Sequence, residues 1–204
     1  MNEKTDNTRI FECFKAGTHT SMGGQTAEWS FADLDRICKN YLYRTDRAPL
    51  VIGHPPTNGP AYGEVTELFH KRGGLYAVAK VGKELLELVK RGYYKHVSAS
   101  FDRASGLPGW SLRHIGFLGS TPPAVKGLAP LAFSEMVEAP GTVCFAAATG
   151  TSVAPPPPIA IPKGWAVTPE GWAFYERARE VHLACPGLSF SEAAALTDKY
   201  ILQF

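Results

Sequence analysis

YKHVSASF (residues 94–101) and SLRHIGFL (residues 111–118) are two short segments joined by the glycine-rich stretch DRASGLPGW. Each has the length and the composition of a β-strand. Side chains alternate between the two faces of a strand, so His96, Ser98 and Ser100 share one face of the first segment. The opposite face is apolar. A strand that only forms the wall of a barrel has no need of such a polar face.

Upstream of these segments, short strands alternate with two helices. Strands are expected at RIFECFKAG, PLVIGH, AYGEVTELF and LYAVAKV, and the last two form an antiparallel hairpin around HKRGG. The stretch THTSMGGQTAEW is expected to be a loop. Helices are expected at SFADLDRICKNY, where Ser30 and Asp33 form a capping box, and at GKELLELVKRG, which ends at Gly92. The sequence therefore predicts an α+β fold with a mostly antiparallel, β-barrel-like domain over residues 1–135.

The composition changes after this domain. Residues 136–164 are rich in Ala, Thr and Pro, with four consecutive prolines, and predict an extended linker. Residues 165–204 predict two helices, the first capped by Thr168 and the second by a capping box of Ser189 and Glu192. Two short helices do not build an independent core. This segment is expected to be an interaction module or the beginning of a longer helical, scaffold-like region.

The bulk composition argues against several classes of protein. The 204 residues include 21 basic and 19 acidic side chains, and this balance gives no electrostatic case for binding nucleic acid or an anionic membrane. No apolar run approaches the ~18 residues of a membrane-spanning helix, and the polar start lacks the pattern of a signal peptide. The four cysteines include no CxxC pair, which indicates reduced thiols. A soluble, cytosolic protein is expected.

The histidines and serines are the candidates for chemistry. Catalysis by a hydroxyl requires a nucleophile, a base that takes its proton, and a group that holds the base. His54, in LVIGHPP, follows a predicted strand, and His114 lies inside another. The residues alone leave open whether His54 only ends its strand. No histidine pair has the spacing HxH or HxxxH, so a metal-dependent hydrolase is disfavoured.

Five motifs in a fixed order carry a family resemblance: LVIGHPP, PAYGEVTEL, GGLYAVAKV, RGYYKHVSASF and LRHIGFLGSTPPAVKGL. The series resembles the Mu-type phage head maturation proteases, called prophage I proteins. It is similar, more distantly, to the tailed-phage prohead proteases and the herpesvirus assemblins. The resemblance covers residues 9–135 and extends weakly into CPGLSFSEAAA.

The resemblance implies a role for three residues. Ser98, which begins the family's Ser-x-x-Phe pattern, is the nucleophile, His54 is the base, and His114 orients His54. Many prohead proteases have an acid near the third position, whereas residues 104–134 contain none and assemblins use a second histidine. A neutral imidazole stabilises an imidazolium less than a carboxylate does, so a slow protease is expected. The turn Gly119–Ser120–Thr121 is the expected source of oxyanion-binding N–H groups.

Other residues remain as alternatives or as expected bystanders. Ser100 is the alternative nucleophile, and His96 is the alternative third residue. The remaining candidates are expected to be loop, surface or solvated residues: His19, Asp35, Glu64, His70 and His182.

The resemblance implies a serine endopeptidase of the Ser-His-His type that needs no cofactor and no metal. Its expected substrates and partners are the scaffold protein and the precursor of the major capsid protein, inside the assembling procapsid in the host cytoplasm. Self-association and self-cleavage in the linker are also expected, and nucleic-acid and membrane partners are not. The rival hypothesis is a proteolytically inactive internal scaffold protein.

Overall fold

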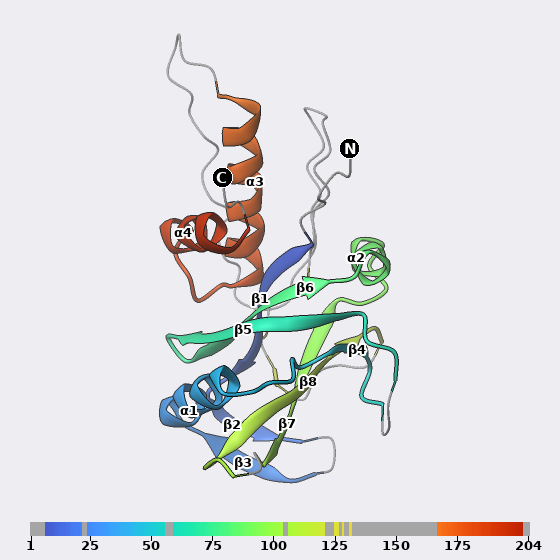
Figure 1. Cartoon of the computed structure of the whole chain (residues 1–204), viewed down its shortest axis with the longest axis vertical. Helices are drawn as coiled ribbons and strands as arrows, with labels where there is room; N and C mark the ends of the chain where they lie inside the picture. The colour runs from blue at the N-terminus through green and yellow to red at the C-terminus, as the bar shows by residue number, and fades with distance from the viewer. Residues whose placement is uncertain are drawn as a thin grey trace.

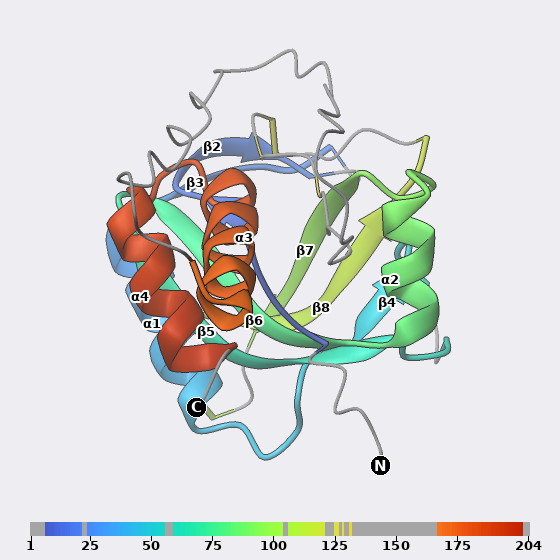
Figure 2. The same cartoon turned by 90° about the horizontal axis from the view of Figure 1, so that it is seen from above.

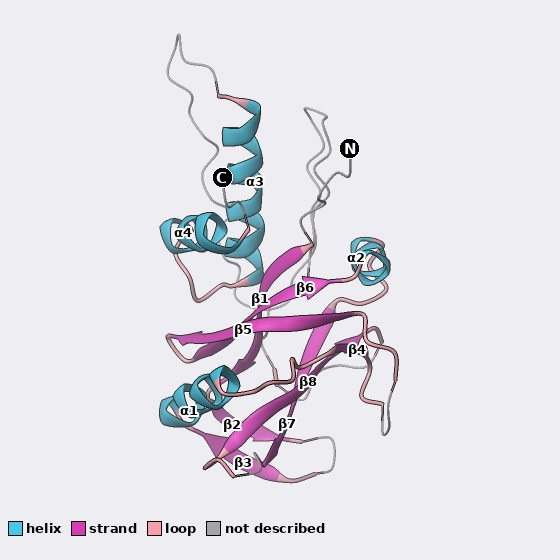
Figure 3. Ribbon diagram, in the orientation of Figure 1, coloured by secondary structure: helices cyan, strands magenta, loops and turns pink. Residues whose placement is uncertain are grey.

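Runs of strands are separated by single helices, and two consecutive helices follow the last described strand (Figure 1; Figure 3). The computed structural model describes residues 7–21, 24–55, 59–103, 106–120, 125–126, 128, 131 and 167–201. The strands are β1 (Thr8–Lys15), β2 (Gly17–Thr20), β3 (Thr26–Trp29), β4 (Leu50–Ile52), β5 (Gly63–Lys71), β6 (Gly74–Val81), β7 (His96–Arg103) and β8 (Trp110–Leu118). The helices are α1 (Phe31–Leu42), α2 (Lys83–Lys90), α3 (Pro169–Ala184) and α4 (Phe190–Tyr200).

The first sheet has the antiparallel order β1-β6-β5. β5 and β6 form the predicted hairpin, in which Lys71 pairs with Gly74 and the turn residues are Arg72 and Gly73. Both turn residues have positive φ angles, 49° and 83°, as a tight two-residue hairpin requires. Arg72 adopts a left-handed conformation that is uncommon for a residue with a Cβ, and its largely exposed side chain pairs with Glu192.

The second sheet has the order β4-β8-β7. β7 and β8 are antiparallel, and this register places Ser98 opposite Gly116 and Ser100 opposite His114. β4 pairs with β8 in parallel, with Val51 opposite Gly116. Hairpin signals in the sequence predict only antiparallel pairs between consecutive strands. β4 and β8 are far apart in the sequence, so no such signal predicts their parallel pairing.

The two sheets form a partly closed, barrel-like arrangement. An isolated bridge between Pro49 and Glu64 connects β4 to β5, so the strands follow one another as β1-β6-β5-β4-β8-β7. Phe14 of β1 and Phe101 of β7 contact edge to face at 4.9 Å between ring centroids. No backbone ladder joins β7 to β1 within the described residues. The predicted α+β, mostly antiparallel fold is confirmed, without a closed barrel in the part of the chain that is described.

The structure confirms the predicted helices α1 and α2 and the residues that bound them. Ser30 and Asp33 form the capping box of α1, and Gly92, with a φ of 77°, follows α2. Helix α1 buries its apolar face, and the hydroxyl of Tyr41 donates to the carbonyl of Val65 at 2.6 Å. The helix is thereby anchored to β5.

Two predictions are wrong: His19 does not lie in a loop, and His182 is not solvated. Residues 18–29 contain the β2–β3 hairpin rather than a loop, and His19 lies in β2 with its Nε2 at 2.8 Å from the carbonyl oxygen of Lys15. His182 is buried rather than solvated, with its Nδ1 at 2.9 Å from the carbonyl oxygen of Leu188. Each ring is held by a nearby carbonyl, a role that spacing along the sequence does not reveal.

The helices α3 and α4 cover the β1-β6-β5 sheet on the side away from β7 and β8 (Figure 1; Figure 2). Thr168 caps α3, and Ser189 with Glu192 forms the capping box of α4, as predicted. The boundaries at residues 135 and 165 stay predictions, and residues 136–164 lie outside the described residues. None of the described helices is long and apolar enough to cross a membrane.

Candidate active site

His54 follows directly after the short strand β4. Gly53 has a φ of 65°, which turns the chain at the end of the strand, and its N–H donates to the carbonyl of Phe117 at 3.0 Å. The left-handed conformation suits glycine because it has no Cβ. This turn places the imidazole of His54 over β8.

His54 and His114 contact each other through their ring nitrogens. The Nδ1 of His54 lies 2.8 Å from the Nε2 of His114, and the ring centroids are 5.1 Å apart. His114 is 6% exposed and is held in the middle of β8, directly opposite Ser100. Of the histidines considered from the sequence, these two are therefore brought together by the fold.

Gly116 provides the space that the His54 ring occupies. A Cβ at this position would lie 2.2 Å from the carbonyl oxygen of Gly53 and 3.2 Å from the Cε1 of His54. Gly116 is the cross-strand partner of Ser98, and directly paired residues point to the same face with Cβ positions ~4.5–5.5 Å apart. The edge of the His54 ring therefore lies over Gly116, beside the half-buried Ser98.

The hydroxyl of Ser98 makes no hydrogen bond with another described residue, His54 included. In substrate-free enzymes such catalytic hydrogen bonds are often long, and they shorten when substrate binds. The observed arrangement is thus a neighbouring serine and imidazole rather than a preformed hydrogen bond.

Burial favours the uncharged form of both imidazoles. Burial lowers the pKa of His54 below its usual 6.5. Burial, followed by the neighbouring His54 and Arg113, lowers the pKa of His114 to about 4, against a smaller opposing effect of Asp102. When the Nδ1–H of His54 donates to the Nε2 of His114, the Nε2 of His54 is left as a free proton acceptor. This is the tautomer that a general base requires.

The remaining candidates occupy different surroundings. Ser100 shares the polar face and lies next to His114, so it is also close to the histidine pair. His96 lies opposite Leu118, at the far end of that face from His114. Asp35 is engaged by Lys39 at 2.6 Å and by His70 at 3.6 Å on the surface. Glu64 is an exposed residue of β5.

A hollow of about 460 Å³ adjoins His54 through Gly53. It lies where β4 and β8 end and β7 begins. Its lining is mostly apolar and aromatic, and consists of Ile52, Gly53, Leu88, Tyr93, Tyr94, Phe117, Leu118, Gly119 and Ser120. Two of the three residues expected to supply oxyanion-binding N–H groups, Gly119 and Ser120, are part of this lining. Thr121 lies outside the described residues, and that role stays a prediction.

Gly53 and Gly116 are the site residues that sequence reasoning missed. Each glycine interrupts or ends a β-branched, aromatic strand pattern, which is a signal for close approach of another backbone or group. The signal does not say which group approaches. The pairing of β4 with β8 shows that the group lying over Gly116 is the ring of His54.

Within the described ranges, no group of three or more His, Cys, Asp or Glu side chains is arranged to hold a metal ion. Cys13, Cys38 and Cys185 are free thiols, and burial raises the pKa of each. The chemistry that the described polar face offers is proton transfer between imidazole and hydroxyl groups.

Fold and site together define an α+β protein in which β4 and β8 place a histidine pair beside the serines of β7. No protein-family model matches the chain, and no curated protein matches it. Among solved structures, the chain is similar to the protease of Kaposi's sarcoma-associated herpesvirus.

Two crystal structures of that protease, one in complex with an allosteric inhibitor and one in complex with a dimer disruptor, are each 16% identical, with TM-scores of 0.37. The alignments cover 56% of this chain and 70% and 71% of those chains. A complex of that protease with a hexapeptide phosphonate inhibitor is 15% identical, with a TM-score of 0.36, over 54% of this chain and 59% of that chain. At these values the likeness carries no conclusion about the site, and the resemblance to Mu-type phage proteases stays a prediction.

Proposed function

We propose that the chain is a serine endopeptidase of the phage head maturation type, with Ser98 as nucleophile, His54 as base and His114 as the residue that orients the base. The observation that carries the proposal is the 2.8 Å contact between His54 and His114, held over Gly116 and therefore beside Ser98. A protein that acts only as a scaffold does not require Ser98, His54 and His114 to lie close together.

The proposed reaction begins when the hydroxyl oxygen of Ser98 attacks the scissile carbonyl carbon. The hydroxyl proton moves to the Nε2 of His54, which becomes an imidazolium and keeps its Nδ1–H bonded to His114. The tetrahedral intermediate collapses, the C–N bond breaks, and His54 gives its proton to the leaving amine. Water then releases the acyl group by the same steps. Because His114 is neutral, it stabilises the imidazolium less than a carboxylate would, so turnover is slow.

The edge of β7 is suited to an extended substrate. β7 is the last strand in the order β4-β8-β7, and no described strand pairs with its outer edge. A peptide that pairs with this edge runs past Ser98, in the mode of strand addition. The apolar hollow beside Gly53 then accepts an aliphatic side chain of the peptide, next to the bond that is cut.

The proposed biological substrates are the scaffold protein and the major capsid protein precursor, inside the assembling procapsid in the host cytoplasm. Self-association and self-cleavage within residues 146–154 complete the proposal. Those residues lie outside the described ones; their sequence, AAATGTSVA, is small and precedes four prolines.

A fluorophosphonate that reacts with activated serines tests the site directly. We expect an adduct on Ser98, located by peptide mapping, that is lost in His54→Ala. The Ser100→Ala and His96→Ala variants are the matched controls on the same strand face, and both should be labelled. An adduct on Ser100 would move the nucleophile to that residue.

The second candidate function is an inactive internal scaffold protein. The observation that favours it is that no described residue, His54 included, hydrogen-bonds the Ser98 hydroxyl. Absence of both labelling and cleavage of scaffold and capsid precursors by folded wild-type protein would refute the protease proposal and leave the inactive scaffold as the remaining candidate.

A further inference from the structure

The β1-β6-β5 sheet is covered on both faces. Burial is continuous from Arg9 to Phe14 in β1 and from Gly74 to Ala79 in β6. Because successive strand residues point to opposite faces, continuous burial means that each face has a covering layer. The β4-β8-β7 sheet covers one face, and the helical segment α3–α4 covers the other (Figure 2).

A buried ion pair joins α3 to β1. The Nε of Arg9 lies 3.0 Å from the Oε1 of Glu180, with side-chain exposures of 5% and 6%. Arg177, on the helix itself, contacts the second carboxylate oxygen at 2.9 Å. The segment also buries apolar side chains in the common core: Val181, Ala184, Cys185, Leu188, Ala193 and Ile201. Separation would break the buried Arg9–Glu180 ion pair and would expose this apolar surface, and both effects favour the docked state.

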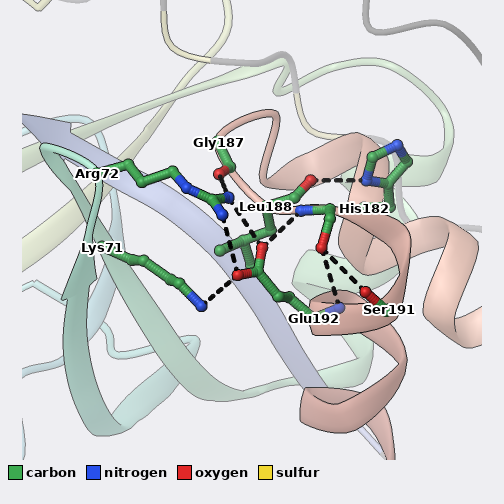
Figure 4. Close-up of polar contacts among 8 residues, drawn as sticks. Lys71, Arg72, His182, Gly187, Leu188, Ser191 and Glu192 are labelled. Carbon is green, nitrogen blue, oxygen red and sulfur yellow. Dashed lines mark hydrogen bonds and ion pairs between the residues drawn. The ribbon is translucent and has the colours of Figure 1, made fainter.

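The turn between β5 and β6 holds the other end of the segment (Figure 4). The guanidinium of Arg72 donates to the carbonyl of Gly187 at 2.8 Å and to both carboxylate oxygens of Glu192 at 2.9 and 3.2 Å. Lys71 contacts the same carboxylate at 2.5 Å. Glu192 also accepts from the N–H of Ser189, so one side chain both caps α4 and binds the sheet. Hydrogen bonds to two oxygens fix orientation as well as position.

Gly187, between α3 and α4, approaches the sheet closely. A Cβ at this position would lie 2.4 Å from the hydroxyl oxygen of the buried Tyr76. The loop between the helices is thus shaped to the surface of β6. Gly171, near the start of α3, differs, since a Cβ there would meet only Thr168 and Val167 at 3.4 Å, within its own segment.

We propose that this face of the β1-β6-β5 sheet is a docking site for the segment 167–201 as a separate polypeptide, and that the segment stays bound when its covalent connection to the sheet is cut. A cut between the two parts then produces a noncovalent complex rather than two free fragments. Any longer helical region that continues from α4 remains tethered to the sheet. This inference does not depend on protease activity.

The test uses the full chain as Ser98→Ala, with the recognition sequence of a site-specific protease inserted between residues 150 and 151. After cutting, the two fragments are diluted in steps and followed by size-exclusion chromatography and native mass spectrometry. We expect co-elution, and a mass equal to the sum of both fragments, at micromolar concentration.

Two variants compare the docking contacts with a matched control. Gly187→Ala should weaken the complex of cut fragments by about tenfold or more, because a methyl group there overlaps Tyr76. Gly171→Ala should leave it unchanged. Thermal melts of the uncut variants check that each chain folds.

Arg72→Ala in the cut chain should weaken the complex by several-fold and reduce its sensitivity to salt, since the Arg72–Glu192 contact is at the rim. Free or precipitated fragments of the cut Ser98→Ala chain, without any docking variant, at micromolar concentration would overturn the proposal. So would equal stability of the Gly187→Ala and Gly171→Ala complexes.

Discussion

Replacement of Gly116 by alanine tests the position of the base without removing any reacting group. The added Cβ would lie 2.2 Å from the carbonyl oxygen of Gly53 and 3.2 Å from the ring of His54. Carbon and oxygen atoms in contact are normally more than 3 Å apart, so the chain carrying His54 has to move by about 1 Å. The ring then moves away from Ser98.

The expected magnitude follows from that displacement. A misplacement of about 1 Å costs roughly 10²-fold in rate, and overpacking of this kind costs about 1–3 kcal/mol of stability. We therefore expect Gly116→Ala to lose about a hundredfold in kcat/KM on a peptide substrate and to remain folded. Gly171→Ala, whose new Cβ meets ordinary contacts at 3.4 Å, is the matched control and should retain wild-type activity.

Two measurements make the test decisive. Peptide cleavage gives kcat/KM, and the ring N–H signal shared by His54 and His114, observed by NMR, reports their contact. A Gly116→Ala protein with kcat/KM within about twofold of wild type would refute the reasoning, because the rate would not depend on where Gly116 places His54.

Four further predictions concern the same site and the linker. In steady-state assays, His54→Ala should lower kcat/KM far more than His114→Ala, since His114 acts only through His54. Equal losses of kcat/KM would contradict the assignment of His54 as the base and His114 as the residue that orients it. The pKa of His114 is about 4, below the 6.5 of an unfolded chain, so as pH falls from 7.5 to 5 the unfolded state takes up a proton first and stability is lost. Urea titrations should show that the free energy of unfolding falls by about 1–2 kcal/mol between pH 7.5 and 5 because of this residue, and by less in His114→Phe. If the free energy of unfolding of both proteins has the same pH dependence, the assignment to His114 is wrong. Leu88→Trp, which narrows the hollow beside Gly53, should reduce cleavage of peptides with large aliphatic side chains more than of those with alanine, and an unchanged preference in a peptide panel would exclude the hollow. Purified wild type should cut itself within residues 146–154 and leave Ser98→Ala intact, as measured by intact mass, and equal cutting of both would point to a contaminating protease.

Local chemistry explains what the sequence predicts well. Ser30 with Asp33 and Ser189 with Glu192 form capping boxes as predicted, because a cap involves only residues three positions apart. That His96, Ser98 and Ser100 share one face of β7 follows from strand alternation alone. These features need no knowledge of the distant chain.

Long-range pairing explains what the sequence does not predict. The parallel contact of β4 with β8 joins residues more than 60 positions apart, and nothing in LVIGHPP names its partner. The same holds for Glu180, whose partner Arg9 lies on the first strand. The proximity of His54 to Ser98 depends on a missing Cβ at Gly116, which composition does not distinguish from any other strand glycine.

The coverage of β1 by α3 has a consequence for synthesis on the ribosome. β1 ends at Lys15 and α3 begins at Pro169, so β1 lacks its outer layer until more than 150 further residues have been made. At roughly 5–20 residues per second, this interval lasts about 8–30 s. During that time one apolar face of the β1-β6-β5 sheet has no covering layer. We expect the growing chain either to bind chaperones on that face or to form the sheet only after α3 and α4 have been made. The β1-β6-β5 sheet is therefore covered on both faces only when α3 and α4 have left the exit tunnel.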